Sequence, residues 1–138
     1  MAQVEMEIDS VRVVLYKYER AINLKEKAGE RYLPIWIDAS QGDMISLARN
    51  LEDMWRGERL RHEFELLGAD LASSRIESVI INQLDNNAFH AKLVASNYDK
   101  SREVDCPLAK AIALAMAREA PIFVDEAVLY EAATPVSI

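Results

Sequence analysis

Apolar and polar residues alternate through the first part of the chain, with the period of two that is typical of half-buried β-strands. The alternation is richest in β-branched residues around Val11 and Val13. It predicts three strands, at residues 4–18, 20–27 and 31–38, with a turn at 28–30 before the third. Pro34 lies inside the third stretch and has no backbone N–H to donate, so we expect that strand at a sheet edge or at a bulge.

The apolar residues take up a helical period after the third predicted strand. Ser40 is suited to an N-cap position, and apolar residues recur at helical spacing from there to Leu51. This pattern predicts two helices, at residues 40–55 and 59–67.

The second half of the chain returns to strands and then alternates between strand and helix. It predicts strands at 75–84 and 88–96 around a turn at 85–87, a short strand ending at Asp105, a helix at 108–119, a strand at 121–124 and a helical turn at 126–132. Pro107 suits the first turn of the longer helix, and Asp125 is placed to cap the last one. We expect a single domain over residues 1–132 and a frayed tail at 133–138.

One stretch of the first half is echoed in the second half. Residues 37–48 align without gaps with residues 104–115, an offset of 105 − 38 = 67 residues. In both copies a strand ends at an aspartate, a short turn follows, and a helix with an apolar face begins. We interpret the echo as a duplicated strand–helix–strand unit. The predicted fold class is α+β, with mostly antiparallel sheets closing around one core and helices packed outside.

Composition narrows the class of protein. The chain has 138 residues, of which 51% are hydrophobic and 28% charged, and its net charge is −7. This negative charge disfavours a nucleic-acid partner, because affinity for phosphates depends on Lys and Arg. A single cysteine, Cys106, excludes an internal disulfide and a multi-cysteine zinc site. Residues 1–7 lack the basic and apolar regions of a signal peptide, and no apolar run approaches the ~18 residues of a membrane span. We therefore expect a cytoplasmic protein without a membrane partner.

Isolated polar residues carry the candidate chemistry, because the chain holds no glycine-rich phosphate loop, paired-histidine zinc helix or nucleophile elbow. His62 has Glu58 and Glu65 at helical spacing and Glu63 beside it, which suits a general base or one arm of a metal site. A solvated helix face, whose histidine is held by neighbouring charges, explains the same pattern and is the commoner case. His90 alternates with Phe89 along a strand and is expected at the surface.

Two aspartates occupy equivalent places in the repeat, Asp38 and Asp105, each at a strand end just before a helix. A carboxylate there accepts backbone N–H groups of the helix, which is the favoured explanation. The alternative is a divalent-ion site, if the two halves bring both carboxylates together. Cys106 follows Asp105 and is either a thiol with a lowered pKa near a helix N-terminus or, more commonly, a small buried apolar residue.

Four blocks of the sequence fall in an order that resembles the bifunctional nuclease domain family. The blocks are Leu33–Ile37, the helix around His62, Phe89–Ala91 and the segment from Asp105 to Val124. The resemblance covers about residues 6–130 and implies an α+β fold with an internal duplication that forms a homodimer. The family takes its name from plant members that degrade both DNA and RNA.

The activity that the resemblance implies is a metal-assisted hydrolysis of DNA or RNA phosphodiesters. In that case the catalytic residues are His62, Glu63 and Asp105. His62 would act as a base or ligand, and the two carboxylates would hold Mg²⁺ or Mn²⁺.

Some positions depart from the family's pattern. Gln41 stands where the family usually has Glu, Glu58 where it has Arg, and Lys110 where it has Asp. Exchange of opposite charges across one contact would preserve the fold. These departures and the acidic net charge favour a second hypothesis, a non-catalytic dimeric binding or regulatory domain with a degenerate site. That hypothesis predicts an apolar patch for self-association.

Overall fold

The structure is a computed structural model that describes residues 2–13, 19–38, 75–85, 88–97 and 100–135. Its elements are β1 (Gln3–Val13), β2 (Glu19–Glu26), β3 (Tyr32–Asp38), β4 (Arg75–Asp85), β5 (Ala88–Asn97), β6 (Lys100–Cys106), α4 (Leu108–Ala117), β7 (Ile122–Asp125) and α5 (Glu126–Ala132). All of the strands and helices predicted within these ranges are confirmed, with shifts at their ends. The helices predicted at 40–55 and 59–67 lie outside the described residues.

The described strands form one mixed sheet of seven, in the order β3-β2-β1-β7-β4-β5-β6. Every neighbouring pair is antiparallel except β4 and β7, which are parallel. The α+β class and the mostly antiparallel pairing are therefore confirmed. The prediction of sheets that close is wrong for the described residues, in which β3 and β6 remain the edges of a single open sheet.

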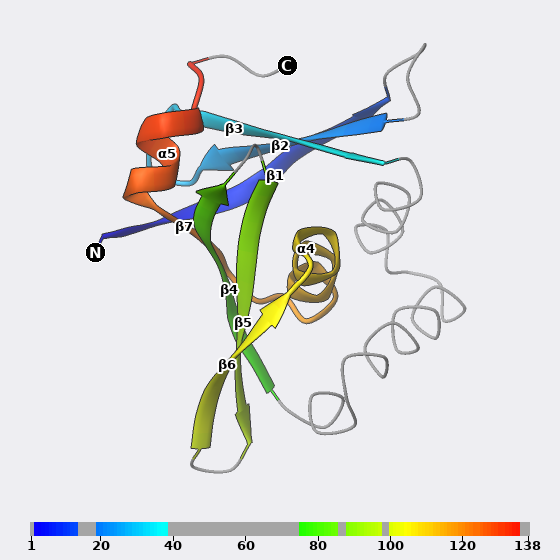
Figure 1. The fold of residues 1–138 in the computed structure, drawn as a ribbon, viewed down its shortest axis with the longest axis vertical. Helices are drawn as coiled ribbons and strands as arrows, with labels where there is room; N and C mark the ends of the chain where they lie inside the picture. Colours follow the sequence, from blue (N-terminus) through cyan, green and yellow to red (C-terminus); the bar gives the residue numbers. More distant parts are fainter. Residues whose placement is uncertain (1, 14–18, 39–74, 86–87, 98–99, 136–138) are drawn as a thin grey trace.

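The sheet is strongly bent, and the two meanders β1–β3 and β4–β6 lie on either side of β7 (Figure 1). In this view β1–β3 run across the molecule, β4–β6 run down it, and α4 lies in the angle between them (Figure 1). Ile122 of β7 joins the two halves, since it pairs with Met6 of β1 on one side and Val79 of β4 on the other. Both halves thus contain a three-stranded meander, and the duplication of a strand–helix–strand unit stays a prediction.

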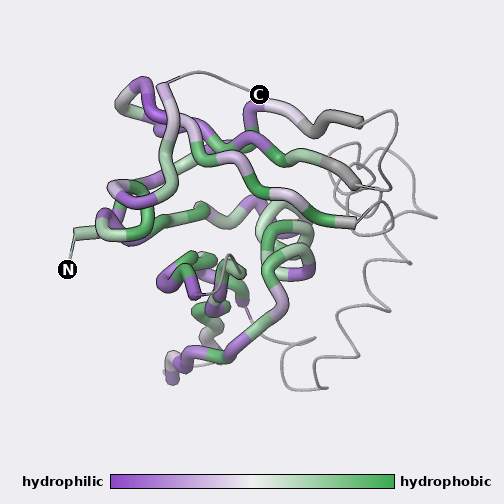
Figure 2. Tube along the Cα trace, turned by 45° about the horizontal axis from the view of Figure 1, so that its top comes forward, coloured by the Kyte–Doolittle hydropathy of each residue, from purple (hydrophilic) through white to green (hydrophobic). Residues whose placement is uncertain are grey.

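Hydrophobic residues alternate with hydrophilic ones along the strands (Figure 2), and the buried hydrophobic residues of strands and helices form one core cluster. Ile22 and Leu24 of β2 stand opposite Ile35 and Leu33 of β3, and all four side chains are buried. Helix α4 packs on β4 and β5, and the five consecutive residues from Ala111 to Ala115 are buried. Five residues exceed one turn, so the middle of α4 is buried all round, whereas Leu108, Lys110 and Met116 are partly exposed. That the helices pack outside the sheet stays a prediction.

Pro34 lies on the edge strand β3, as its missing N–H group predicts. On the outer side of β3, Tyr32 donates to the Thr134 carbonyl at 2.8 Å and accepts from the Thr134 N–H at 2.7 Å. Backbone groups two residues apart in a strand point the same way, so the nitrogen of Pro34 also faces outward. The absent donor therefore costs no bond to β2, and the chain is held by backbone pairing as far as Thr134.

Two helix ends differ from the sequence-based predictions. Helix α4 ends at Ala117 rather than at 119, because Glu119 takes a left-handed backbone conformation with φ of 54°. Asp125 occupies the N-cap position of α5, but its side chain makes no capping hydrogen bond. No helix in the described ranges is both long and apolar enough to span a membrane.

Candidate functional site

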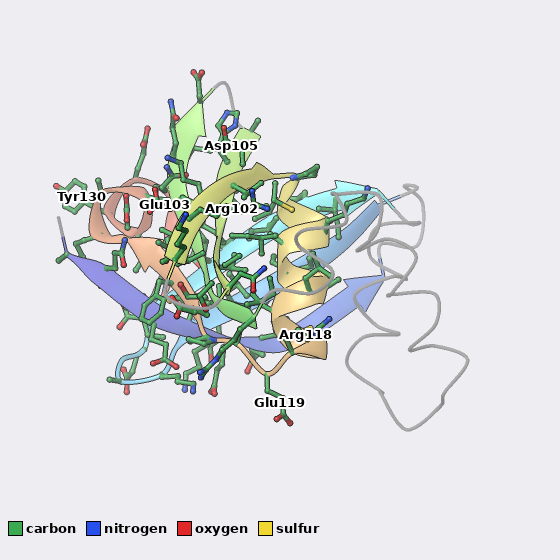
Figure 3. The ribbon with its side chains drawn as sticks, turned by 90° about the horizontal axis from the view of Figure 1, so that it is seen from below. Arg102, Glu103, Asp105, Arg118, Glu119 and Tyr130 are labelled. Atoms are coloured by element: carbon green, nitrogen blue, oxygen red, sulfur yellow. The ribbon has the colours of Figure 1, made fainter. Side chains whose placement is uncertain are left out.

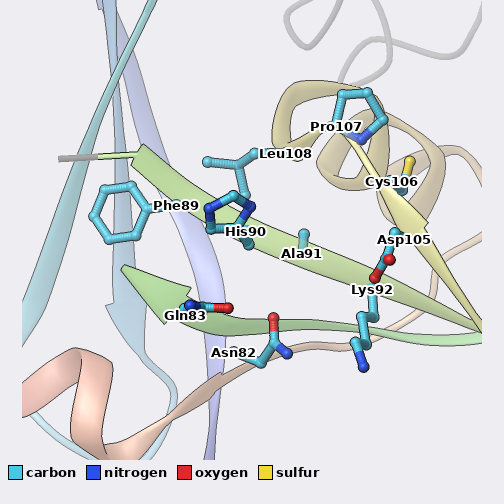
Figure 4. A pocket seen from close by; sticks show the side chains of 10 residues that line it. All are labelled: Asn82, Gln83, Phe89, His90, Ala91, Lys92, Asp105, Cys106, Pro107 and Leu108. Atoms are coloured by element: carbon cyan, nitrogen blue, oxygen red, sulfur yellow. The ribbon is translucent and has the colours of Figure 1, made fainter. Parts of the chain in front are cut away.

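Asp105 lies where strand β6 ends and the chain turns towards α4. The last pairs between β5 and β6 are Lys92 with Asp105 and Ala91 with Cys106. Beyond them, residues 88–90 of β5 have no neighbouring strand on that side among the described residues, which leaves a notch at the sheet edge. This notch forms a pocket of about 560 Å³ (Figure 4). Its lining comprises Asn82, Gln83, Phe89, His90, Ala91, Lys92, Asp105, Cys106, Pro107 and Leu108.

The pocket brings together a cation, an imidazole and a carboxylate. Asp105 is exposed, and no hydrogen bond or ion pair joins its carboxylate to another described residue. The Lys92 ammonium lies 3.8 Å from a carboxylate oxygen of Glu103, and both side chains are partly exposed, so water competes with this pair. His90 is exposed, as its alternation with Phe89 predicts. Such a set can position an anion and exchange protons with it.

A β-bulge in β4 shapes the wall of the pocket. Ile81 stands opposite Ala91 and Gln83 opposite His90, so Asn82 is an extra residue in its strand. The side-chain oxygen Oδ1 of Asn82 is buried without a hydrogen-bond partner among the described residues. Bulges re-aim side chains and occur often beside active sites. The sequence analysis missed Asn82 because the register shift depends on the pairing with β5.

The N-terminal end of α4 forms another wall. Its N-cap is Pro107, which offers no side-chain acceptor, and the first turn carries no acidic residue. The leading N–H groups of the helix therefore give this wall a partial positive charge. Asp105 does not occupy the cap position, so the predicted capping role is wrong for this residue.

Cys106 lies beside Asp105 but turns into the core. Its residue is 6% exposed, and burial raises the pKa of the thiol to about 11, although the positive charge of Lys110 acts in the opposite direction. The thiol is therefore protonated at neutral pH. The prediction of a small buried residue is confirmed, and the alternative of a thiol with a lowered pKa is wrong.

The other predicted site residues are not placed beside Asp105. His62 and Glu63 lie outside the described residues, as do Gln41 and Glu58. Asp38 is the last residue of β3, but its side chain is not described. Within the ranges that the structure describes, no three His, Cys, Asp or Glu side chains gather closely enough to hold a metal ion.

A second pocket of about 580 Å³ lies at the other end of α4, and Figure 3 shows Arg118 and Glu119 there, far from Asp105. Its charged lining residues are Arg75, Glu77, Arg118 and Glu119. The formal charges of these four residues cancel, so the lining gives no net attraction for an anion or a cation. The notch beside Asp105 is the stronger candidate.

Comparison with known proteins identifies a family and two relatives that this chain resembles. The sequence profile of the bifunctional nuclease domain matches residues 22–137. The chain is also 30% identical over 130 residues to an uncharacterized protein of Mycobacterium tuberculosis, found in strains CDC 1551 and H37Rv. The match covers 93% of this chain and 75% of that protein.

Proposed function

Because the chain belongs to the bifunctional nuclease domain family, we propose that it hydrolyses phosphodiester bonds of DNA or RNA in the pocket beside Asp105. The observation that carries this proposal is the presence of Lys92, His90 and Asp105 in the lining of one pocket of an acidic protein. A phosphodiester is an anion, and its cleavage needs a positioned phosphate and a proton acceptor for the attacking water.

The pocket residues suit separate parts of this chemistry. The Lys92 ammonium and the N–H groups of α4 would attract the phosphate and stabilise the charge that develops on it. Asp105 has a carboxylate that forms no ion pair with another described residue, and in the proposed chemistry it orients the attacking water. His62 and Glu63 complete the proposed catalytic set, with His62 as the base.

The described residues do not by themselves fit a metal ion. Asp105 and His90 supply one carboxylate and one imidazole to the pocket, and Mg²⁺ is usually held by carboxylates together with water and substrate phosphates. A Mg²⁺ or Mn²⁺ site at Asp105 therefore requires Glu63 or His62 as well. No step of the proposed chemistry is derived through a metal.

A non-catalytic binding or regulatory role is the second candidate. It is favoured by the presence of one carboxylate, Asp105, among the pocket-lining residues, and by Glu58 and Lys110 at positions where the family usually carries the opposite charge. In either role we propose that two copies of the chain form a cytoplasmic homodimer, and that its halves arose by duplication.

Hydrolysis of labelled single-stranded DNA and RNA in Mg²⁺ or Mn²⁺ tests the proposal, with His62→Ala and Glu63→Gln run beside the wild type. The proposal predicts cleavage by the wild type and at least a hundredfold slower cleavage by both variants, because each variant removes one group of the proposed catalytic set. Equal cleavage by the wild type and both variants would show that the activity does not depend on the proposed site. A folded wild type that cleaves neither substrate would favour the binding role.

A further inference from the structure

Asn82 is a polar residue of the pocket lining to which the proposed chemistry assigns no role. Its Oδ1 is the buried side-chain atom that lacks a hydrogen-bond partner in the part of the chain that the structure describes. Figure 4 shows the Asn82 oxygen directed towards β5, on which His90 and Ala91 lie. We infer that Asn82 determines substrate specificity by accepting a hydrogen bond from a donor group of a bound nucleotide. This inference rests on the proposed function.

An unsatisfied buried acceptor is costly for a fold. Leaving such a group without a partner destabilises a protein by about 1–3 kcal/mol, so native structures leave few of them. A leucine would fill the same space without this cost. The presence of an asparagine at this position is therefore explained by a bound ligand that donates a hydrogen bond to Oδ1.

The position of Asn82 is rigid. Strand β4 lies inside the sheet, between β7 and β5, and the neighbours Ile81 and Gln83 both pair with β5. The bulge fixes the backbone of the extra residue between two paired positions, while its side chain keeps its own rotations. Because Oδ1 is covered in this structure, a turn of the amide presents it to a ligand in the pocket. A pocket that holds such an acceptor discriminates against ligands that lack the matching donor, because the acceptor is then left unpaired.

The chemistry of the pocket defines the donor. A phosphodiester at neutral pH carries no proton to donate, so a phosphate held by Lys92 does not satisfy Asn82. Nucleotides offer two kinds of donor close to their phosphate, the ribose 2′-hydroxyl and the N–H groups of the bases. Either one would satisfy the same oxygen, and the two sources differ in a measurable way.

The experiment measures binding of three phosphorothioate-linked oligomers of equal length, namely oligo(rU), oligo(dU) and an abasic deoxyribose backbone. Oligo(rU) and oligo(dU) differ in the 2′-hydroxyl, whereas oligo(dU) and the abasic backbone differ in the base. The proteins are the wild type, Asn82→Leu, and Gln83→Leu as a control that removes the neighbouring amide of the same pocket. Fluorescence anisotropy gives the dissociation constants.

We expect the wild type to prefer one oligomer of a pair by about tenfold, the effect of one hydrogen bond to a buried partner. Asn82→Leu should reduce that preference severalfold or more, while Gln83→Leu should keep it. Loss of the rU-to-dU preference identifies the 2′-hydroxyl, and loss of the dU-to-abasic preference identifies the base.

Preferences that Asn82→Leu leaves unchanged would overturn this inference but not the proposed function. Absence of binding to all three oligomers by the wild type would overturn both. Urea unfolding supplies an independent readout, because Asn82→Leu should unfold at the same or a higher urea concentration. A clear decrease would show that Asn82 has a structural partner and would also overturn the inference.

Discussion

Asp105 and Cys106 are neighbours in sequence with opposite environments. Strand alternation directs Asp105 to the solvent and Cys106 into the core, where it stands opposite Ala91. The charge thus remains hydrated and the thiol is desolvated. This division follows from the sequence pattern alone, once the segment is known to be a strand.

The raised pKa of Cys106 predicts low thiol reactivity. At pH 8 a thiol with a pKa of about 11 is almost entirely protonated, and the thiolate is the reactive form. A disulfide reagent should therefore label the native protein far more slowly than the urea-unfolded protein, and the native rate should rise as the pH approaches 11. Equally fast labelling of both states at pH 8 would contradict the buried, protonated thiol.

The sequence predicts single residues of the site more readily than it predicts which residues come together there. Asp105 is predictable from sequence because it ends a strand before a helix, and it lines the pocket. Lys92 and Asn82 were missed because they join Asp105 only through the pairing of β5 with β4 and β6. Register and bulges depend on long-range pairing, which the local pattern does not encode.

At the scale of elements, the predicted strands and helices are close to those described. The reason is that the alternation of apolar and polar residues, and the Gly, Pro and Asn residues that mark turns, are local signals. The surroundings of α4 are harder to predict, because its sequence pattern indicates an apolar face, whereas Ala111 to Ala115 are all buried. Small residues such as Ala111, Ala113 and Ala115 let the middle of the helix be buried all round, and this fit depends on the bend of the sheet.

Truncation of Leu114 tests how closely α4 is packed. The side chain is 2% exposed within the core, so Leu114→Ala should lower the free energy of unfolding by about 2–5 kcal/mol. Urea denaturation measures this difference. The control is Leu108→Ala on the same helix, where the side chain is only partly buried and a smaller loss is expected. Equal losses would contradict the enclosed position of α4.

Helix α5 is tied to the sheet by a charged contact. The guanidinium of Arg31 donates to both carboxylate oxygens of Glu126, at 2.7 and 3.0 Å, and also to Glu26 of β2. This contact lowers the pKa of Glu126 and raises that of Arg31. Because the Glu126 carboxyl titrates at a lower pH in the folded state than when unfolded, its contribution to stability is present above its ordinary pKa of 4.5.

Acid should therefore remove the contribution of Glu126 to stability. As the pH falls below 4.5 and through the lowered pKa, the wild type should lose more stability than Glu126→Gln, which lacks this carboxylate. The comparison is made by urea unfolding between pH 7 and pH 3. Glu131→Gln, at an exposed position of the same helix, should lose as much as the wild type. Parallel losses in all three proteins would contradict the role of the contact.

At the scale of the whole molecule, the two sheet edges differ. The edge strand β6 exposes Lys100, Arg102, Glu103 and Asp105, which discourage pairing with another strand. The edge strand β3 lacks a donor at Pro34 and pairs with Thr134 at Tyr32. Both edges are thus poor templates for strand addition, so we expect self-association through side chains.

Trp36 is the side chain we expect in the homodimer interface. It is 49% exposed on β3, and buried tryptophans contribute strongly to interfaces. Trp36→Glu should convert the proposed dimer to a monomer in size-exclusion chromatography with light scattering. Tyr130→Glu, at the 89% exposed Tyr130 of α5, is the control and should remain dimeric. A Trp36→Glu variant that stays dimeric would place the interface elsewhere.

The central claim is that phosphodiester hydrolysis takes place beside Asp105, and one comparison tests it most directly. Cleavage of labelled RNA and DNA by Asp105→Asn is measured beside Asp85→Asn, which alters an exposed aspartate outside the pocket lining. We predict a loss of at least a hundredfold for Asp105→Asn, unchanged thermal stability, and wild-type activity for Asp85→Asn. Cleavage by Asp105→Asn at the wild-type rate would contradict the claim.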